Sequence, residues 1–371
     1  MKTLTKGDIE DLIVGATILG VGGGGDPGKG LEILMDLSNK GKKMVIASLE
    51  EFGSEGVLAS PYFVGSVAPT QPKKIMPKIV EDPIEVAFKL LESNLGQNIV
   101  GTVASEIGGG NTAASLAIAA KLGIPMLDGD LMGRAGPELH QSTVHIFGIP
   151  MSPSAIVSET GNEFLVEKYA GIDDYESMAR YASVVSGGHV AVVDTPLSKP
   201  KARECVVLGT ISRCVEIGHS RREAAEQGKD PVGAIIGKLK DAKKIFEGTV
   251  SEYTWKDEKG FLYGEAHVRG SRDFSERTLK SWIMNEHIMC WIDEKPAVMP
   301  PDLIMFVDPK TGLGITNDKL KKDTDVVVLG SSIDPVWRND KGLELFGPRH
   351  FGFDYDYVPF EELAGARQNQ K

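Results

Sequence analysis

In the stretch 99–127 the spacing of apolar residues changes from that of a strand to that of a helix and back. This stretch is the centre of the predicted fold. Ile99–Ala104 is a short, partly β-branched apolar run that predicts a buried strand. Alanine and leucine then recur at helical spacing until Gly123, after which a second apolar run predicts another strand. The order strand, helix, strand predicts a βαβ unit. Its right-handed crossover places the loop 106–111 beside Asp128–Asp130, at the strand ends where open α/β sheets bind ligands.

Helices and strands also alternate before this unit. The predicted elements are a helix after Thr5, a helix over 31–37, strands over 44–47 and 56–65, and a helix from Asp82 to about Leu95. Such alternation is typical of a mainly parallel sheet covered by helices. We therefore predict an α/β N-terminal domain over residues 1–166.

Beyond Gly148 the pattern changes to short strands bounded by glycine or aspartate. The predicted strands are 184–194, 204–208, 248–255, 261–268, 297–307 and 325–329, and a polar helix in two pieces surrounds 228–231. These runs predict a β-rich α+β second domain over residues 167–363. The polar end, 364–371, is expected to be disordered.

Composition narrows the class of partner. The chain has 371 residues, of which 41% are hydrophobic and 25% charged, enough for two globular cores. Its formal net charge of −11 argues against nucleic acid and anionic membranes as partners. A small-molecule partner is expected instead, and assembly into a homo-oligomer stays open.

Cysteine usage and the absence of targeting signals favour a cytoplasmic location. Cys205, Cys214 and Cys290 form no CxxC pair, which suits a reducing compartment, and Cys290 lies in an apolar run typical of a buried, inert thiol. The segment 12–21 lacks the basic flank and continuous apolar core of a signal peptide. No apolar run reaches the length of a transmembrane helix.

A run of four glycines, 22–25, needs a physical explanation because glycine loses more entropy on folding than other residues. Residues 23–29 match the start of a phosphate-binding loop, but Gly30 replaces its Ser or Thr and no strand precedes it. Either two backbones approach closely here, or N–H groups face an oxygen of a ligand. We expect this loop and loop 106–111 to share one pocket. The candidate binding residues of the two loops are Gly24, Gly25, Asp26, Glu106, Gly109, Gly110 and Asn111.

Asp128 and Asp130 are two residues apart, so both side chains project to one side of the predicted strand end. Two close carboxylates either hold a cation or share a proton, whereas the alternative is that both cap turns. Arg134 either pairs with one aspartate or holds a substrate carboxylate. Asp128, Asp130, Arg134 and Glu138 are the catalytic candidates.

Three further polar positions complete the set of candidates. His140, close to Glu138, suits metal ligation or proton transfer, but a single histidine is also common as a structural residue. His189 and the cluster Asn285-Glu286-His287 could face the first domain across a cleft, with structural hydrogen bonding as the alternative. Of these, His140 and Glu286 are kept as candidates for substrate binding. The sequence leaves the cofactor unknown, with a divalent metal ion as one option.

Three blocks of the sequence resemble one known family. Leu19–Pro27, Glu106–Asn111 and Asp128–Glu138 are similar to signature blocks of the S-methyl thiohydantoin desulfurase family. Further similar blocks lie at 246–250, 260–264, 285–286, 301–304 and 347–349, so the resemblance covers nearly the whole chain. The family usually has an aromatic residue where this chain has Gly136, which leaves room in the expected pocket.

The resemblance implies a hydrolase that removes sulfur from a hydantoin- or thiohydantoin-like five-membered ring by attack of water at C2. Such a reaction needs a base or a metal-bound hydroxide, stabilisation of charge on the ring, and an acid for the leaving thiolate. In this reading the carboxylates named above supply base and acid, while Arg134 and the amides of 108–111 stabilise charge. Two alternatives stay open: a non-hydrolytic isomerase or lyase for a related cyclic imide, and a non-catalytic subunit of a hydantoinase-type complex. G-x-S-x-G, H-E-x-x-H and a strand-linked G-x-G-x-x-G are all missing from the sequence.

Overall fold

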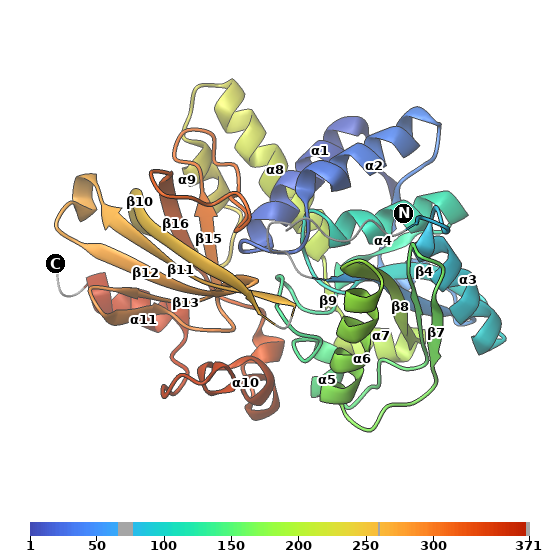
Figure 1. The fold of residues 1–371 in the computed structure, drawn as a ribbon. Coiled ribbons are helices and arrows are strands. Elements are labelled where there is room, and N and C mark those ends of the chain that lie inside the picture. The colour runs from blue at the N-terminus through green and yellow to red at the C-terminus, as the bar shows by residue number, and fades with distance from the viewer. Residues whose placement is uncertain (66–76, 259, 369–371) are drawn as a thin grey trace.

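Two β-sheets, one in each half of the chain, form the framework of the protein (Figure 1). The computed structural model describes residues 1–65, 77–258 and 260–368. The first sheet has the strand order β1-β2-β5-β4-β3-β8-β6-β7, and β9 pairs with β5. Its strands are β1 (Lys2–Thr3), β2 (Val45–Ala47), β3 (Val57–Gly65), β4 (Ile99–Ala104), β5 (Met126–Asp130), β6 (Ser154–Val157), β7 (Glu163–Val166), β8 (His189–Leu197) and β9 (Val207–Leu208).

The centre of this sheet is parallel, as predicted. β2, β5, β4 and β3 pair in parallel, and antiparallel strands extend the sheet on both sides. The predicted βαβ unit is confirmed, because β4 and β5 are parallel neighbours joined by α4 (Asn111–Leu122). The polar loops that follow the two strands therefore leave the same edge of the sheet.

Helices cover both faces of the first sheet. The N-terminal half contributes α1 (Lys6–Leu19), α2 (Pro27–Asn39), α3 (Pro83–Leu95) and α5 (Thr143–Ile146), followed by α6 (Ile172–Val185), α7 (Lys199–Cys205), α8 (Thr210–Glu226) and α9 (Pro231–Ile236). α3 and α4 share one apolar cluster with β3, β6 and β8, while α6 and α7 pack into a second cluster on the opposite face. Apolar residues on both sides of the central strands explain why these strands read as continuous hydrophobic runs.

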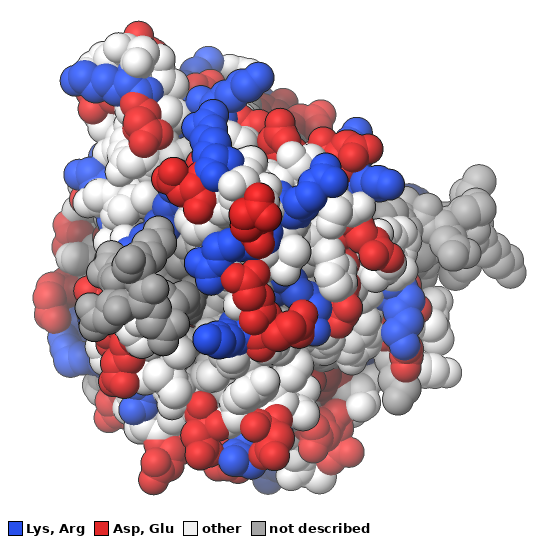
Figure 2. All heavy atoms as spheres, turned by 90° about the vertical axis from the view of Figure 1, so that its left-hand side faces the viewer, with Lys and Arg blue, Asp and Glu red and all other residues white. Residues whose placement is uncertain are grey.

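The second sheet is antiparallel throughout, with the order β14-β13-β12-β11-β10-β16-β15. Its strands are β10 (Lys243–Glu258), β11 (Phe261–Gly270), β12 (Thr278–Met284), β13 (Glu286–Ile292), β14 (Lys295–Val298), β15 (Leu303–Val307) and β16 (Asp325–Ser331). The helices α10 (Asp340–Phe346) and α11 (Phe360–Gln368) accompany it. Figure 2 views the molecule from the side of this sheet and shows acidic and basic side chains interspersed. The predicted β-rich second part is confirmed.

The two halves share a hydrophobic core. Residues of α1 and α8 pack with β15, β16, Trp337 and Phe346 in one buried cluster. The indole N–H of Trp337 also donates to the carbonyl oxygen of Met132 at 2.7 Å. The segment that follows β5 is thus fixed from the second half of the chain.

Several predicted elements have different bounds in the structure. The strand expected over 297–307 is two strands, because Pro300 and Pro301 have no N–H to donate to a ladder. Of the strand expected over 204–208, only β9 (Val207–Leu208) is a strand, because α7 extends to Cys205. β8 begins at His189, after Gly187 and Gly188 with φ of 92° and 115°.

The predicted domain boundary at Val166 stays a prediction, although β8 and β9 beyond it belong to the first sheet. α11 extends into the segment 364–371 that was expected to be disordered, and 369–371 lie outside the described residues. None of the helices in the described ranges combines the length and apolarity needed to cross a membrane.

Candidate active site

The two glycine-rich loops lie against each other, as predicted. The carbonyl oxygen of Gly24 accepts from the N–H groups of Gly110 at 3.0 Å and Asn111 at 3.1 Å. A Cβ on Gly24 would lie 2.4 Å from the Cα of Gly108, and Gly24 has a φ of 75°. Only glycine fits such an approach and conformation. Of the two explanations for the glycine run, the structure therefore shows close backbone approach.

Asp26 and Gly109 support this arrangement without lining a pocket. The Asp26 carboxylate caps α2 by accepting from the N–H groups of Gly28 at 2.8 Å and Lys29 at 3.3 Å. A Cβ on Gly109 would lie 2.6 Å from the Cβ of Pro27. Both residues fix the start of α2 against the loop that precedes α4.

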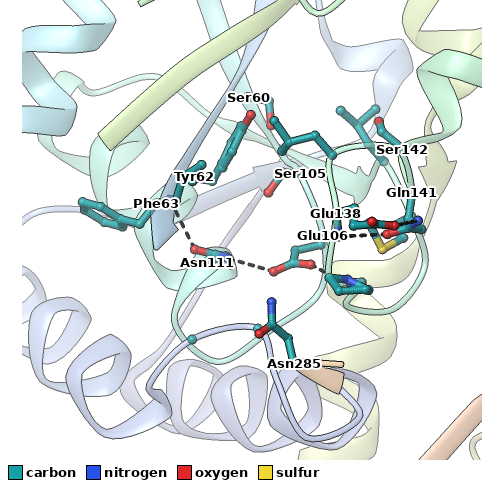
Figure 3. A pocket seen from close by; sticks show the side chains of 18 of the residues that line it. Ser60, Tyr62, Phe63, Ser105, Glu106, Asn111, Glu138, Gln141, Ser142 and Asn285 are labelled. Carbon is teal, nitrogen blue, oxygen red and sulfur yellow. Dashed lines mark hydrogen bonds between the residues drawn. The ribbon is translucent and has the colours of Figure 1, made fainter. Parts of the chain in front are cut away.

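A cavity of about 210 Å³ opens beside these loops (Figure 3). Its wall comes from the ends of β3 and β8, the loops after β4 and β5, α6, and the turn between β12 and β13. Six predicted candidates line it: Gly24, Gly25, Glu106, Asn111, Glu138 and Glu286. Gly136 also lines it, and a Cβ there would meet the Met132 sulfur at 2.8 Å. Met132 and Gln141 occupy the space next to the Gly136 backbone, so the room expected at this position is not present.

Glu106 is the central carboxylate of the pocket. Its side chain accepts from the Asn111 amide at 2.7 Å and from the Gly136 N–H at 3.0 Å. Burial raises the pKa of Glu106 to about 7, against the opposing effect of these two hydrogen bonds and the charge of Arg134. A carboxylate with this pKa exchanges a proton near neutrality.

Glu286 reaches the same pocket from the second half of the chain. It begins β13, is 2% exposed, and its Oε2 has no hydrogen-bond partner among the described residues. Burial, together with the charge of Glu106, raises the pKa of Glu286 well above its usual value. The pocket therefore holds two buried carboxyl groups whose environments favour a proton on at least one of them.

Backbone contacts fix the position of Glu286 against the glycine run. The His287 N–H donates to the Val21 carbonyl at 2.9 Å, and the Asn317 N–H donates to the Gly22 carbonyl at 2.8 Å. A Cβ on Gly23 would lie 1.8 Å from the Oε1 of Glu286. A side chain at Gly23 would therefore displace the Glu286 carboxylate from this position.

Glu138 lies at another part of the wall and is tied to the C-terminal segment. Its carboxylate is 2.6 Å from the Nε2 of His350 and accepts from the Gln141 amide at 2.9 Å. Burial acts to raise the pKa of Glu138, but these hydrogen bonds and the nearby histidines hold it below the usual value. Glu138 is therefore a carboxylate anion at neutral pH. His140 pairs with Asp173 at 2.9 Å instead and does not line the pocket.

Asp128 and Asp130 do share one face of the strand end, but that face packs against α8. Asp128 accepts from the N–H of Ser212 at 2.8 Å and from its hydroxyl at 2.6 Å, in the first turn of α8. Asp130 accepts from the N–H groups of Met132 at 2.9 Å and Gly133 at 2.6 Å. Neither aspartate lines the pocket. These are the turn-capping and helix-capping contacts that were the alternative to a cation or a shared proton.

Arg134 is fully buried and connects the two halves of the chain. Its guanidinium donates to the backbone carbonyl groups of Ala135, His287, Pro301 and Asp302, at 2.7–3.1 Å. These contacts show no ion pair of Arg134 with Asp128 or Asp130. They also show that the guanidinium is not free to bind a substrate carboxylate. The guanidinium instead satisfies carbonyl groups that come together where the halves meet.

The sequence analysis missed a second polar cluster of the pocket, on β3 and β8. Asp194 is fully buried, and its Oδ2 accepts from the hydroxyls of Tyr62 at 2.6 Å and Tyr175 at 2.8 Å. Its Oδ1 accepts from the Thr195 hydroxyl at 2.8 Å. Asp194, Tyr62 and Thr195 line the pocket together with Ser60, whereas Tyr175 does not. Polar residues within otherwise apolar strands were the one signal that could have indicated this cluster.

Of the remaining candidates, one lines the pocket and one lies outside its lining. His189 lines the pocket and its ring lies edge-on to Phe63, with 6.4 Å between ring centroids. Cys290 is buried, as expected. Within the described ranges, no three His, Cys, Asp or Glu side chains are grouped so that they could hold a metal ion.

The comparison with family models assigns the chain to one family. Family models match the chain in two adjacent parts, the S-Me-THD-like N-terminal domain over residues 7–168 and the S-Me-THD-like C-terminal domain over residues 171–360. Among solved structures, an X-ray crystal structure of a protein from Chromobacterium violaceum is similar over 97% of this chain and 100% of its own, with a TM-score of 0.77. The two sequences are 20% identical, so this likeness concerns the fold alone. No curated protein matches the chain.

Proposed function

The chain belongs to the S-Me-THD-like family, and from this membership and its pair of buried glutamates we propose that it hydrolyses S-methyl thiohydantoin-like rings at C2. Water adds to C2 and the C2–S bond breaks. The ring then carries a carbonyl group at C2, and the sulfur leaves with a proton as methanethiol. One water is consumed and no oxidant or reductant is needed.

The single observation that supports this proposal is the placement of Glu106 and Glu286 in one pocket. With a pKa of about 7, Glu106 is partly ionised at neutral pH and takes the proton from the attacking water. Burial and the charge of Glu106 favour the protonated form of Glu286, which donates its proton toward the ring nitrogen or the departing sulfur. The two glutamates thus divide the roles of base and acid according to their environments.

In this proposal the other candidates hold the catalytic glutamates and the surrounding segments in place and do not contact the reacting atoms. The Asn111 amide orients the Glu106 carboxylate, and the glycine loops bring Glu286 close. Asp128, Asp130 and Arg134 hold the surrounding segments through the contacts described above. We assign them no proton transfer, because none of the three lines the pocket.

A turnover assay with the purified full chain tests the proposal. The protein is incubated with 2-methylthio-hydantoin, 2-thiohydantoin and hydantoin, and the products are followed by mass spectrometry and by a thiol assay. We expect hydantoin and methanethiol in equal amounts from the S-methyl substrate. The matched control is Glu106→Gln, which keeps the shape and the hydrogen-bond acceptor but cannot accept a proton.

The other outcomes separate the alternatives. Rearrangement or cleavage of the ring without loss of sulfur would identify an isomerase or lyase. Tight binding of a cyclic imide without turnover, alone or with a partner, would identify a non-catalytic subunit. Either result would contradict the proposed desulfurisation.

A further inference from the structure

The pocket wall carries three buried polar atoms without a hydrogen-bond partner among the described residues: the hydroxyls of Ser60 and Ser142, and Oε2 of Glu286. A buried polar atom without a partner lowers stability, so such atoms are rare and need an explanation. A ligand that supplies the missing hydrogen bonds is one explanation when the atoms surround a cavity. Glu286 already has a role in the proposed function, whereas Ser60 does not.

Ser60 is the more deeply buried of the two serines and lies within a strand. It is 0% exposed and lies opposite Asp194 in the antiparallel pairing of β3 with β8. In the view of Figure 3, Ser60 lies on the other side of Glu106 from Asn285. Glu106 thus lies between Ser60 and Asn285 in this view.

None of the described residues around Ser60 accepts a hydrogen bond from its hydroxyl. The carboxylate of Asp194 is occupied by Tyr62, Tyr175 and Thr195. Thr195 has a φ of 53°, which is an unusual conformation for a β-branched residue and is held by its N–H bond to the Met151 carbonyl at 2.8 Å. Such local strain beside a cavity is typical of a preorganised binding site.

We propose that Ser60, backed by Tyr62 and Asp194, forms a subsite that binds the C4 carbonyl oxygen of the ring while C2 faces Glu106. This inference rests on the proposed function. The Ser60 hydroxyl donates to the ring carbonyl, and the Tyr62 oxygen, whose proton is held by Asp194, accepts from the adjacent ring N–H. Ser60 and Tyr62 are positioning residues that fix which ring carbon meets the water.

The test compares the affinities of the wild type and Ser60→Ala for two ligands, measured by calorimetric titration of the full chain. The ligands are hydantoin, the product, and imidazolidin-2-one, the same ring without the C4 carbonyl. We expect Ser60→Ala to weaken hydantoin binding by roughly three- to tenfold, the effect of one neutral hydrogen bond, and to leave imidazolidin-2-one binding unchanged. Equal effects on both ligands, or no effect on either, would overturn the inference.

A matched control separates binding from folding. Ser115 also has a buried hydroxyl without a partner among the described residues, but it lies in α4 and does not line the pocket. We expect Ser60→Ala and Ser115→Ala to have a Tm equal to or above that of the wild type, since each removes an unsatisfied group. Only Ser60→Ala should weaken hydantoin binding.

The two tyrosines that bind Asp194 provide a second, independent pair. Tyr62→Phe and Tyr175→Phe each remove one hydroxyl from the same oxygen of Asp194, but only Tyr62 lines the pocket. We expect the KM for 2-methylthio-hydantoin to rise with Tyr62→Phe by roughly three- to tenfold and to stay unchanged with Tyr175→Phe. Equal changes in both variants would show that the cluster is structural.

Failure of this inference differs from failure of the proposed function. If hydantoin binds with no dependence on Ser60, the subsite is wrong and the hydrolase proposal stands. If the comparison shows the expected coupling but no substrate is turned over, the subsite stands and the hydrolase proposal is wrong. If hydantoin does not bind to the wild type, both are wrong.

Discussion

Two pairs of acidic side chains, Asp128 with Asp130 and Glu106 with Glu286, have different surroundings in the structure. These surroundings give the two pairs different roles. Asp128 and Asp130 are two residues apart and were the stronger candidates from the sequence. Glu106 and Glu286 are 180 residues apart in the sequence and meet in one pocket. Proximity in sequence thus did not decide which carboxylates face a ligand.

The difference lies in what packs against each pair. The start of α8 covers the aspartates and supplies N–H and hydroxyl donors to Asp128, so this carboxylate is satisfied by the protein. Glu106 and Glu286 instead line the cavity. Glu286 keeps an oxygen with no partner among the described residues, as Asp130 does away from the cavity. A carboxylate that the fold satisfies stabilises the fold, whereas one left facing a cavity is available for a ligand.

The largest expected effect is on turnover by Glu106→Gln. We expect kcat for 2-methylthio-hydantoin to fall by about 10²-fold or more, as removal of a positioned base typically does. The fold should be retained, because Gln keeps an oxygen for the Asn111 amide or the Gly136 N–H. Steady-state kinetics and a thermal melt check the two parts, and a variant with normal kcat would remove Glu106 from the chemistry.

Asp128→Ala should lower stability and leave kcat nearly unchanged, and its effect should be smaller. The substitution removes the acceptor for the Ser212 N–H at the start of α8, and loss of such a cap costs about 1 kcal/mol of stability. We expect urea unfolding to show this decrease in the free energy of unfolding while kcat stays within about twofold of the wild type. A large loss of kcat at normal stability would place Asp128 in the mechanism.

The expected effect on activity is smallest for Asp130→Asn, which should change how stability depends on pH. Burial raises the pKa of Asp130 from 3.8 to about 7, so the folded state holds a proton that the unfolded state has released between these values. The contribution of Asp130 to stability is therefore full below about pH 4 and is lost as the pH rises toward about 7. In Asp130→Asn, which cannot ionise, the free energy of unfolding should fall less over this range. Denaturant titrations at a series of pH values measure the slope, and an unchanged slope would contradict the prediction.

Local patterns predicted the elements and the meeting of the two glycine loops. The period of apolar residues and the flanking glycines located β4, α4 and β5, and the handedness of the crossover placed loop 106–111 beside the end of β5. Four successive glycines indicated a close approach of two backbones. All of these follow from interactions within short stretches of chain.

Contacts over long sequence separations could not be predicted in the same way. The spacing of Asp128 and Asp130 correctly put both on one face, but it does not show that α8, which starts 80 residues after Asp130, covers that face. Arg134 looked suited to a carboxylate, yet its guanidinium donates to three carbonyl groups from distant segments and to that of the adjacent Ala135. The antiparallel insertion of β8 beside β3, which creates the Asp194 cluster, likewise depends on the whole sheet.

The most direct test of the account is the pH dependence of kcat/KM for 2-methylthio-hydantoin in the wild type, Glu106→Gln and Asp130→Asn. Burial gives Glu106 and Asp130 the same pKa of about 7, so only the variants can assign the group that controls activity. We expect kcat/KM to rise with pH and level off above about 7 in the wild type and in Asp130→Asn, because Glu106 must lose its proton to act as a base. The residual activity of Glu106→Gln should lack this step. If the step instead disappears in Asp130→Asn and persists in Glu106→Gln, the base is the aspartate and the central claim is wrong.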